Sequence, residues 1–304
     1  MSIEWKGVFP AVTTKFTADD ELDFEMFETN IQAQLEAGVD GIILGGTLGE
    51  ASSLQEDEKD TLVTRTVEMV GGKVPVIMNI AEQTTKAAIE AAAKAKKNGA
   101  SGLMMLPPMR YKADDRETVE YFKTVANSTT LPIMVYNNPV DYNIEVTLDM
   151  FEELAECENI RAVKESTRDI SNITRMINRF GDRFKIMSGV DTLAMESLLM
   201  GSVGWVAGLV CAFPKETVAI YRLVKAGRID EALKIYRWFL PLLELDINAH
   251  LVQNIKLAEV ATGIGTEIVR APRLPLAGAE RKKVLNIIEN GLTTRPELPD
   301  YLNL

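Results

Sequence analysis

Lys164 is the residue whose surroundings most clearly indicate chemistry, because it follows the apolar residues Ala162 and Val163 in a segment of strand length. A lysine in a strand that is covered on both faces loses hydration, and desolvation favours its neutral amine. A neutral amine is the nucleophile that attacks a carbonyl carbon to form a Schiff base. A lysine at the end of a strand also occurs as an ordinary surface cation, with its ammonium group in water or paired with a carboxylate such as that of Glu165.

A glycine-rich turn, Gly45-Gly46-Thr47-Leu48-Gly49-Glu50, follows an earlier apolar run. Three glycines around Thr47 permit a tight turn in which backbone N–H groups point toward one centre. Such an arrangement binds anions, and a substrate carboxylate is small enough to fit. The same composition is also found in plain connections between a strand and a helix.

Tyr136 ends another apolar run and is followed by Asn137-Asn138-Pro139. Its hydroxyl can transfer protons if neighbouring groups lower its pKa, although a tyrosine at the end of a strand also packs as an ordinary aromatic side chain. Two further turns consist of small residues and leave room for a ligand: Ser188-Gly189-Val190-Asp191 and Val206-Ala207-Gly208.

Eight apolar runs of strand length recur along the first two thirds of the chain. Continuous apolar runs are typical of parallel strands that are buried on both faces. They comprise residues 8–12, 41–44, 74–78, 103–106, 133–136, 162–164, 184–187 and 205–207.

Between these runs lie segments with helical spacing and helix-terminal residues. Helices are expected from Phe24 to the stop at Gly38, after Thr84 as far as Lys97, and from Asp114, Thr147 and Asp191 onward. Ser, Thr or Asp at the start of a helix and Gly at its end satisfy the orphaned backbone groups there. Alternation of strands and helices indicates an α/β protein, and eight strands favour a (β/α)₈ TIM barrel. An open doubly wound sheet is the alternative, but no Gly-x-Gly-x-x-Gly follows the first strand.

After Pro214 only helical patterns remain, at residues 217–225, 229–245, 252–262 and 279–290. The first of these can serve as the eighth helix of the barrel. We therefore expect a barrel over residues 1–226 and a C-terminal helical extension over residues 227–304. Active sites of this fold lie at the carboxyl ends of the strands, where Lys164, Tyr136 and the three turns are expected to meet.

Composition excludes several classes of protein. The net charge is −11 and no long block of Lys or Arg occurs, so binding to a nucleic-acid backbone is disfavoured. Cys157 and Cys211 have neither metal-ligand spacing nor the density of a disulfide framework, which favours a reducing compartment. The N-terminus lacks the pattern of a signal peptide, and we expect a cytoplasmic protein without a membrane partner. His250 is the only histidine, so neither a metal site nor a Ser-His-Asp triad is expected.

Four of these segments resemble the dihydrodipicolinate synthase / N-acetylneuraminate lyase family of class I lyases. The family's Gly-Thr-Thr/Ser-Gly-Glu corresponds to residues 46–50, its Tyr-Asn-x-Pro to residues 136–139, its Lys-Glu to residues 164–165 and its Ser-Gly-x-Asp to residues 188–191. The resemblance runs from about Gly7 to the end of the chain. It implies that Lys164 forms the imine without any other cofactor and that Tyr136 relays protons.

The resemblance also implies the residues of the binding site. The turn at Gly46, Thr47 and Leu48 is expected to hold the substrate carboxylate. Ser188, Gly189 and Val206 are expected to line the pocket. The partner would be a small 2-oxo acid or cyclic imine acid, and the family is commonly homotetrameric, with a dimer as the alternative.

The chain also departs from the synthases of this family. Leu48 replaces the second hydroxyl residue of the carboxylate turn, and Asp141 stands where the synthases carry an Arg. Asp141 would repel a second substrate carboxylate. The synthases' paired Tyr after the fourth strand is also disturbed, because the segment reads Pro107-Pro108-Met109-Arg110-Tyr111. We expect Arg110, Tyr111, Asp141 and Tyr142 to set selectivity for the second substrate or leaving group.

These variants are similar to those of a catabolic branch of the family. The leading hypothesis is deamination and dehydration of 1-pyrroline-4-hydroxy-2-carboxylate to 2,5-dioxopentanoate. The alternative is a pyruvate-dependent aldolase, such as dihydrodipicolinate synthase or another 2-keto-3-deoxy acid aldolase or dehydratase. A non-catalytic sensor of small molecules is a third class, which the Lys164 and Tyr136 pair disfavours.

Overall fold

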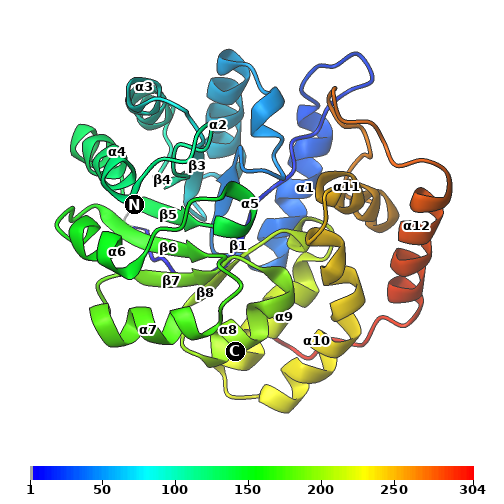
Figure 1. Ribbon diagram of the computed structural model, residues 1–304. Helices are drawn as coiled ribbons and strands as arrows, with labels where there is room; N and C mark the ends of the chain where they lie inside the picture. The colour runs from blue at the N-terminus through cyan, green and yellow to red at the C-terminus, as the bar shows by residue number, and fades with distance from the viewer. Residues whose placement is uncertain (1–2) are drawn as a thin grey trace.

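The computed structural model describes residues 3–304 and contains a single sheet of eight parallel strands (Figure 1). The strand order is β1-β8-β7-β6-β5-β4-β3-β2, and a parallel bridge between Ala11 and Ile43 brings the two ends of the sheet together. The predicted (β/α)₈ barrel is confirmed. The strands are β1 (Gly7–Pro10), β2 (Ile42–Leu44), β3 (Val76–Ile80), β4 (Gly102–Met105), β5 (Ile133–Asn137), β6 (Ile160–Glu165), β7 (Lys185–Ser188) and β8 (Gly204–Ala207).

Burial explains why continuous apolar runs identified the strands. All residues of six strands are buried, and the exceptions are Arg161 in β6 and Lys185 in β7. One face of each strand points into the barrel and the other packs against helices, so neither face needs polar residues. The observed bounds differ from the predicted ones by only one or two residues, as is usual for the ends of elements.

Helices surround the barrel on its outside (Figure 1). Four of the predicted starts carry side-chain caps: Asp23, Thr84, Asp114 and Thr147 each accept a hydrogen bond from a backbone N–H three residues ahead. The helices around the barrel are α1 (Phe24–Ala37), α2 (Glu56–Val70), α3 (Thr85–Lys97), α4 (Asp115–Ser128), α6 (Leu148–Leu154), α7 (Ser171–Phe180), α8 (Ala194–Leu199) and α9 (Pro214–Lys225). The short helix α5 (Pro139–Tyr142) follows β5 and lies over the carboxyl ends of the strands instead.

The C-terminal extension is helical, as predicted. It consists of α10 (Ile229–Leu243), a short 3₁₀ helix η4 (Glu244–Asp246), α11 (Leu251–Thr262) and α12 (Gly278–Thr293). Helix α10 packs against α9 of the barrel, and η4 contacts the 3₁₀ helix η2 (Asp191–Leu193) that follows β7. The extension therefore reaches the end of the barrel at which the strands have their carboxyl termini. A domain division at residue 226 stays a prediction.

Within residues 3–304, no helix combines the length and the apolar character that crossing a membrane requires.

Candidate active site

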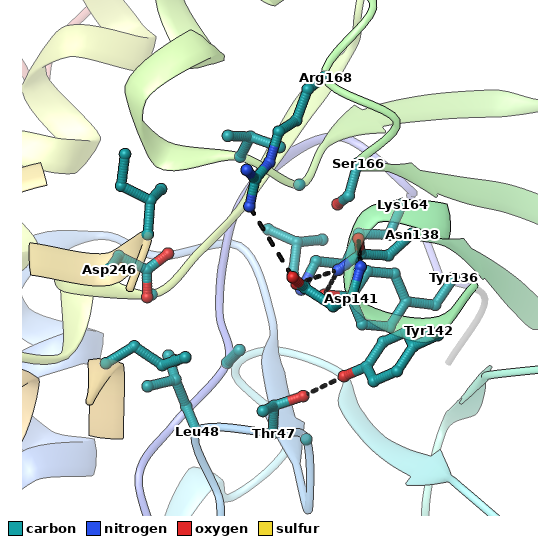
Figure 2. A pocket seen from close by; sticks show the side chains of 18 of the residues that line it. Thr47, Leu48, Tyr136, Asn138, Asp141, Tyr142, Lys164, Ser166, Arg168 and Asp246 are labelled. Atoms are coloured by element: carbon teal, nitrogen blue, oxygen red, sulfur yellow. Dashed lines mark hydrogen bonds and ion pairs between the residues drawn. The ribbon is translucent and has the colours of Figure 1, made fainter. Parts of the chain in front are cut away.

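A cavity of about 440 Å³ opens at the carboxyl ends of the strands (Figure 2). It brings together seven of the eight residues that the sequence assigned to the site: Gly46, Thr47, Leu48, Tyr136, Lys164, Gly189 and Val206. The eighth, Ser188, is buried behind this cavity, near Glu165. The side chain of Ser188 is therefore not brought to the predicted pocket.

Lys164 lies in β6, directly beside Tyr136 of β5 in the sheet register. Its Nζ is 4.1 Å from the centroid of the Tyr136 ring, and the residue is only 8% exposed. Burial lowers the pKa of the Lys164 ammonium group, as expected for a desolvated amine. Glu165 points to the other face of β6, where Asn172 donates a 2.9 Å hydrogen bond to it. Lys164 is thus neither a surface cation nor the partner of Glu165.

Gly189 makes room for the lysine. A Cβ atom at position 189 would lie 2.6 Å from Cγ of Lys164 and 2.1 Å from Oγ of Ser166. Non-bonded carbon atoms normally stay about 3.5–4.0 Å apart. Glycine is therefore needed at position 189 if Lys164 is to occupy the position seen here.

Tyr136 is buried, and its hydroxyl oxygen accepts a 3.0 Å hydrogen bond from Nδ2 of Asn138. Burial raises the pKa of Tyr136, and the hydrogen bond from Asn138 only partly opposes this. The pKa lowered by neighbours, which the sequence analysis named as a condition for proton transfer, is not found, because desolvation of the phenolate outweighs the effect of the neighbours. The phenol therefore stays protonated at neutral pH, in the form that donates a proton.

Tyr142, from the short helix α5, connects Tyr136 to the glycine-rich turn. Its ring packs edge-on against that of Tyr136 at a centroid distance of 5.6 Å. Its hydroxyl lies 2.5 Å from Oγ1 of Thr47 (Figure 2). Burial raises the pKa of Tyr142, and its interaction with Thr47 lowers that pKa to a lesser extent. The two tyrosines and Thr47 thus place three hydroxyl groups along one wall of the cavity.

The glycine-rich turn is held from both sides. Nδ2 of Asn79 donates a 2.8 Å hydrogen bond to the carbonyl of Gly45. At the other end Glu50 adopts a left-handed conformation with φ of 53°, and its buried carboxylate accepts a hydrogen bond from Lys256 of α11. A non-glycine residue in this conformation is uncommon and requires support from its surroundings.

Asp141 lies in the cavity but is not an isolated negative charge. It accepts a 2.7 Å hydrogen bond from Asn138, and Nη2 of Arg168 lies 3.8 Å from its other oxygen. Arg168 is a site residue that the sequence analysis missed, although it follows Lys164 by only four positions. A search of the whole loop after the sixth strand would have found it. The expected repulsion of a second carboxylate by Asp141 is thus opposed by a guanidinium group in the same cavity.

Arg110 and Tyr111 are not among the residues that line this cavity. They follow β4, where the backbone N–H of Arg110 donates to Gln83, and Tyr111 is 55% exposed. Within this chain the two candidate selectivity residues from α5, Asp141 and Tyr142, therefore reach the site, whereas those after β4 do not.

Asp246 is the second residue that the sequence analysis missed. It belongs to η4 of the extension and lines the cavity together with Lys164. No motif marks it, since only the packing of the extension on the barrel brings it to the strand ends. His250, four residues later, forms an exposed 2.6 Å contact with Glu280. Among residues 3–304 no group of three or more His, Cys, Asp or Glu side chains is arranged to hold a metal ion.

Comparison with known proteins matches residues 4–291 to the Dihydrodipicolinate synthetase family. The chain is 30% identical over 277 residues to 4-hydroxy-tetrahydrodipicolinate synthase 1 of Halalkalibacterium halodurans, covering 91% of this chain and 94% of that protein. It is 32% identical to the 4-hydroxy-tetrahydrodipicolinate synthase of Sorangium cellulosum, covering 91% and 93%. The crystal structure of dihydrodipicolinate synthase from Aquifex aeolicus superposes with a TM-score of 0.89 at 28% identity, covering 93% and 97%.

The match spans the barrel and most of the extension, and the relatives agree over nearly their full length. The chain therefore belongs to the dihydrodipicolinate synthetase family, whose lyases join their substrate to a lysine as a Schiff base without an external cofactor.

Proposed function

We propose that this protein is a pyruvate-dependent lyase of the aldolase type, in which Lys164 forms the Schiff base. The observation that carries the proposal is the buried amine of Lys164, which lines the cavity 4.1 Å from the centroid of the Tyr136 ring. Its lowered pKa increases the fraction of neutral amine, which is the nucleophilic form. The names of the relatives support synthase chemistry over deamination.

The cavity supplies a group for each step. The substrate carboxylate binds at the turn of Gly46, Thr47 and Leu48, and the amine of Lys164 attacks C2. The resulting carbinolamine loses water and leaves a protonated imine, which accepts the electron pair of the adjacent carbon. Tyr136, protonated and close to Lys164, transfers protons during these steps.

A second candidate is the deamination and dehydration of 1-pyrroline-4-hydroxy-2-carboxylate. Leu48 and Asp141 favour it, because they depart from the synthase pattern at positions that meet the substrate. In this reaction Lys164 attacks C2 of the cyclic imine and opens the ring, after which water and ammonia leave. Both candidates use the same lysine and differ in what happens at the distal carbons.

Borohydride reduction in the presence of pyruvate tests the common step. We expect a reduced pyruvate adduct on the peptide that contains Lys164 and none on Lys164→Ala. The buried Lys256 is a matched control, since it should remain unmodified. A protein that forms no adduct with any 2-oxo acid would instead be a sensor or a structural protein.

Product analysis then separates the two reactions. Release of pyruvate from 4-substituted 2-oxo acids supports the aldolase, whereas ammonia from 1-pyrroline-4-hydroxy-2-carboxylate supports the deaminase.

Light scattering of the pure protein tests the predicted homotetramer against a dimer.

A further inference from the structure

The glycine-rich turn presents backbone donors to the cavity. Gly46, Thr47 and Leu48 all line the cavity. Within residues 3–304 the N–H groups of these three residues donate to no backbone carbonyl. Such groups bind an anion when they converge on one point. Convergence depends on how the peptide groups of the turn are rotated, so the side chains that fix those rotations decide whether the turn can hold a carboxylate.

Asn79 holds the first carbonyl of the turn. It lies in β3, where all five residues are buried and the other four are apolar. Its Nδ2 donates a 2.8 Å hydrogen bond to the carbonyl oxygen of Gly45, a residue with φ of 62°. In a planar trans peptide the C=O and N–H bonds point in opposite directions. The Gly45 carbonyl that is held toward Asn79 therefore turns the N–H of Gly46 away from Asn79.

The oxygen of the same Asn79 amide is left without a partner. Its Oδ1 is shielded from solvent and has no hydrogen bond within residues 3–304. A buried polar atom without a partner is destabilising, and an apolar side chain would fit the pattern of β3 without this effect. The stability of the strand therefore does not explain an asparagine at position 79, whereas its bond to the Gly45 carbonyl does.

Thr14 holds the last carbonyl of the turn. It follows β1, which adjoins β2 on the side opposite β3. The Thr14 side chain is buried, and its Oγ1 donates a 2.7 Å hydrogen bond to the carbonyl of Gly49. A Cβ atom at Gly49 would lie only 3.0 Å from the backbone nitrogen of Gly45, so the two ends of the turn lie against each other. Side chains from both neighbouring strands thus hold the turn at its two ends.

The bond from Thr14 begins a chain of peptide groups that ends at Leu48. The Gly49 carbonyl shares its peptide group with the N–H of Glu50, which donates a 3.1 Å hydrogen bond to the carbonyl of Thr47. The Thr47 carbonyl in turn shares its peptide group with the N–H of Leu48. Hydrogen bonds that are linked through peptide groups polarise one another. Thr14 therefore both orients and strengthens the N–H of Leu48, as Asn79 does for that of Gly46.

We propose that Asn79 and Thr14 are positioning residues that aim the N–H groups of Gly46 and Leu48 at the substrate carboxylate. This inference rests on the proposed Schiff base at Lys164 and on the proposed binding of the carboxylate at the turn. Neither Asn79 nor Thr14 is among the residues that line the cavity, so both act through the peptide groups. Their loss should weaken recognition of the carboxylate and leave the reactivity of Lys164 unchanged.

The test uses two ligands that differ in charge, pyruvate and its uncharged amide, pyruvamide. Each is trapped on Lys164 by borohydride, and mass spectrometry gives the rate of adduct formation as a function of ligand concentration. We expect the unchanged protein to reach its half-maximal rate at a pyruvate concentration at least about tenfold below that of pyruvamide, because hydrogen bonds to a charged acceptor are the stronger ones.

Thr14→Val and Asn79→Leu each remove one donor and insert an apolar side chain of similar size. We expect each variant to raise the half-maximal concentration of pyruvate about three- to tenfold and to leave that of pyruvamide within about twofold. The maximal rate at saturating pyruvate should stay within about threefold, because only binding of the carboxylate is affected. Thr14→Ser keeps the hydroxyl group and should restore the preference for pyruvate.

Thr66 provides the matched control. Its Oγ1 donates a 2.6 Å hydrogen bond to the carbonyl of Leu62 within α2, and its side chain is fully buried but is not part of the cavity lining. Thr66→Val therefore loses the same kind of buried bond as Thr14→Val. We expect it to leave the half-maximal concentrations of both ligands unchanged.

An equal rise for pyruvate and pyruvamide in Thr14→Val would overturn the positioning role, because it would show a general loosening of the cavity. No rise for either ligand would also overturn it, as would an unchanged protein that does not distinguish the two ligands. If Asn79→Leu does not fold, the Thr14 variants decide the question. Failure of the unchanged protein to trap pyruvate is a different result, because it removes the proposed Schiff base itself.

Discussion

Lys256 on α11 donates a 2.5 Å hydrogen bond to the carboxylate of Glu50, and both side chains are fully buried. The other Glu50 oxygen accepts a 3.1 Å hydrogen bond from Arg270 N. Burial lowers the pKa of Lys256 to about 8, against the opposing effect of Glu50. This ion pair joins the extension to the glycine-rich turn, 206 positions away in the sequence.

Replacing Glu50 tests that connection. Glu50→Ala leaves the Lys256 ammonium group buried without its partner, and we expect a loss of about 3–5 kcal/mol in the free energy of unfolding. KM for the 2-oxo acid should rise as the turn loosens. Urea unfolding and steady-state kinetics measure the two effects.

The double variant Glu50→Leu with Lys256→Met should lose less stability than the two single variants summed, because no unpaired charge remains buried. The exposed pair of Lys6 and Glu4 provides the control, since Lys6→Met should change stability by less than about 1 kcal/mol. Additive losses in the double variant would show that the Glu50–Lys256 pair does not act as a unit.

Gly189→Ala is expected to displace Lys164, because the new Cβ would meet its Cγ at 2.6 Å. The rate of adduct formation with pyruvate should fall by more than about tenfold, while the fold is retained. Gly181→Ala is the control for the adduct rate, since a Cβ there meets nothing within 4 Å and Gly181 does not line the cavity. Its φ of 54° strains an alanine and should lower stability, but no neighbouring side chain is displaced. Equal adduct rates in both variants would contradict the packing argument.

The lowered pKa of Lys164 also predicts how stability depends on pH. The native pKa lies below the unfolded value of about 10.4. Between these two values the unfolded chain binds the proton and the native chain does not, so stability rises with pH in that window. Lys164→Met should lack this rise and be more stable below it. Thermal unfolding from pH 7 to 9.5 measures the difference, and parallel curves would count against a depressed pKa.

Tyr136→Phe should retain the pyruvate adduct but exchange the C3 protons of pyruvate with solvent about 10²- to 10⁴-fold more slowly. Tyr142→Phe removes the hydroxyl group that contacts Thr47. We expect kcat/KM for this exchange to fall about tenfold, mostly through a rise in KM. Deuterium incorporation followed by NMR gives both rates. The exposed Tyr111 does not line the cavity and is the control, since Tyr111→Phe should leave exchange unchanged.

The barrel could be predicted from sequence because both faces of its strands are buried. Apolar runs ending at Tyr136 and Lys164 predicted two strands that are neighbours in the sheet, and both residues line the cavity at the strand ends. The spacing of Ile173, Met176 and Ile177 in α7 is also typical of a helix, although the sequence analysis above does not predict a helix at this position. Local sequence patterns are therefore sufficient to predict most of the strands and helices of the fold.

Other features depend on packing between distant segments. Ser188 follows the family motif, but its strand register turns its side chain away from the cavity. The direction of the Tyr136 pKa depends on the depth of burial, which no local pattern gives. Asp246 reaches the cavity only because α10 and η4 pack over the barrel.

The short 3₁₀ helix at the start of the loop before α11 has a consequence for how this protein could acquire new substrates. Lys164 and Tyr136, the groups proposed to form the imine and to move protons, lie on strands whose hydrogen bonds hold the whole barrel, so these positions tolerate little change. Asp246 belongs to a three-residue 3₁₀ helix outside the sheet, and a substitution there alters the lining of the cavity while Lys164 keeps its place. Substitutions in the C-terminal extension can thus change the lining of the cavity without changing the strands that carry Lys164 and Tyr136.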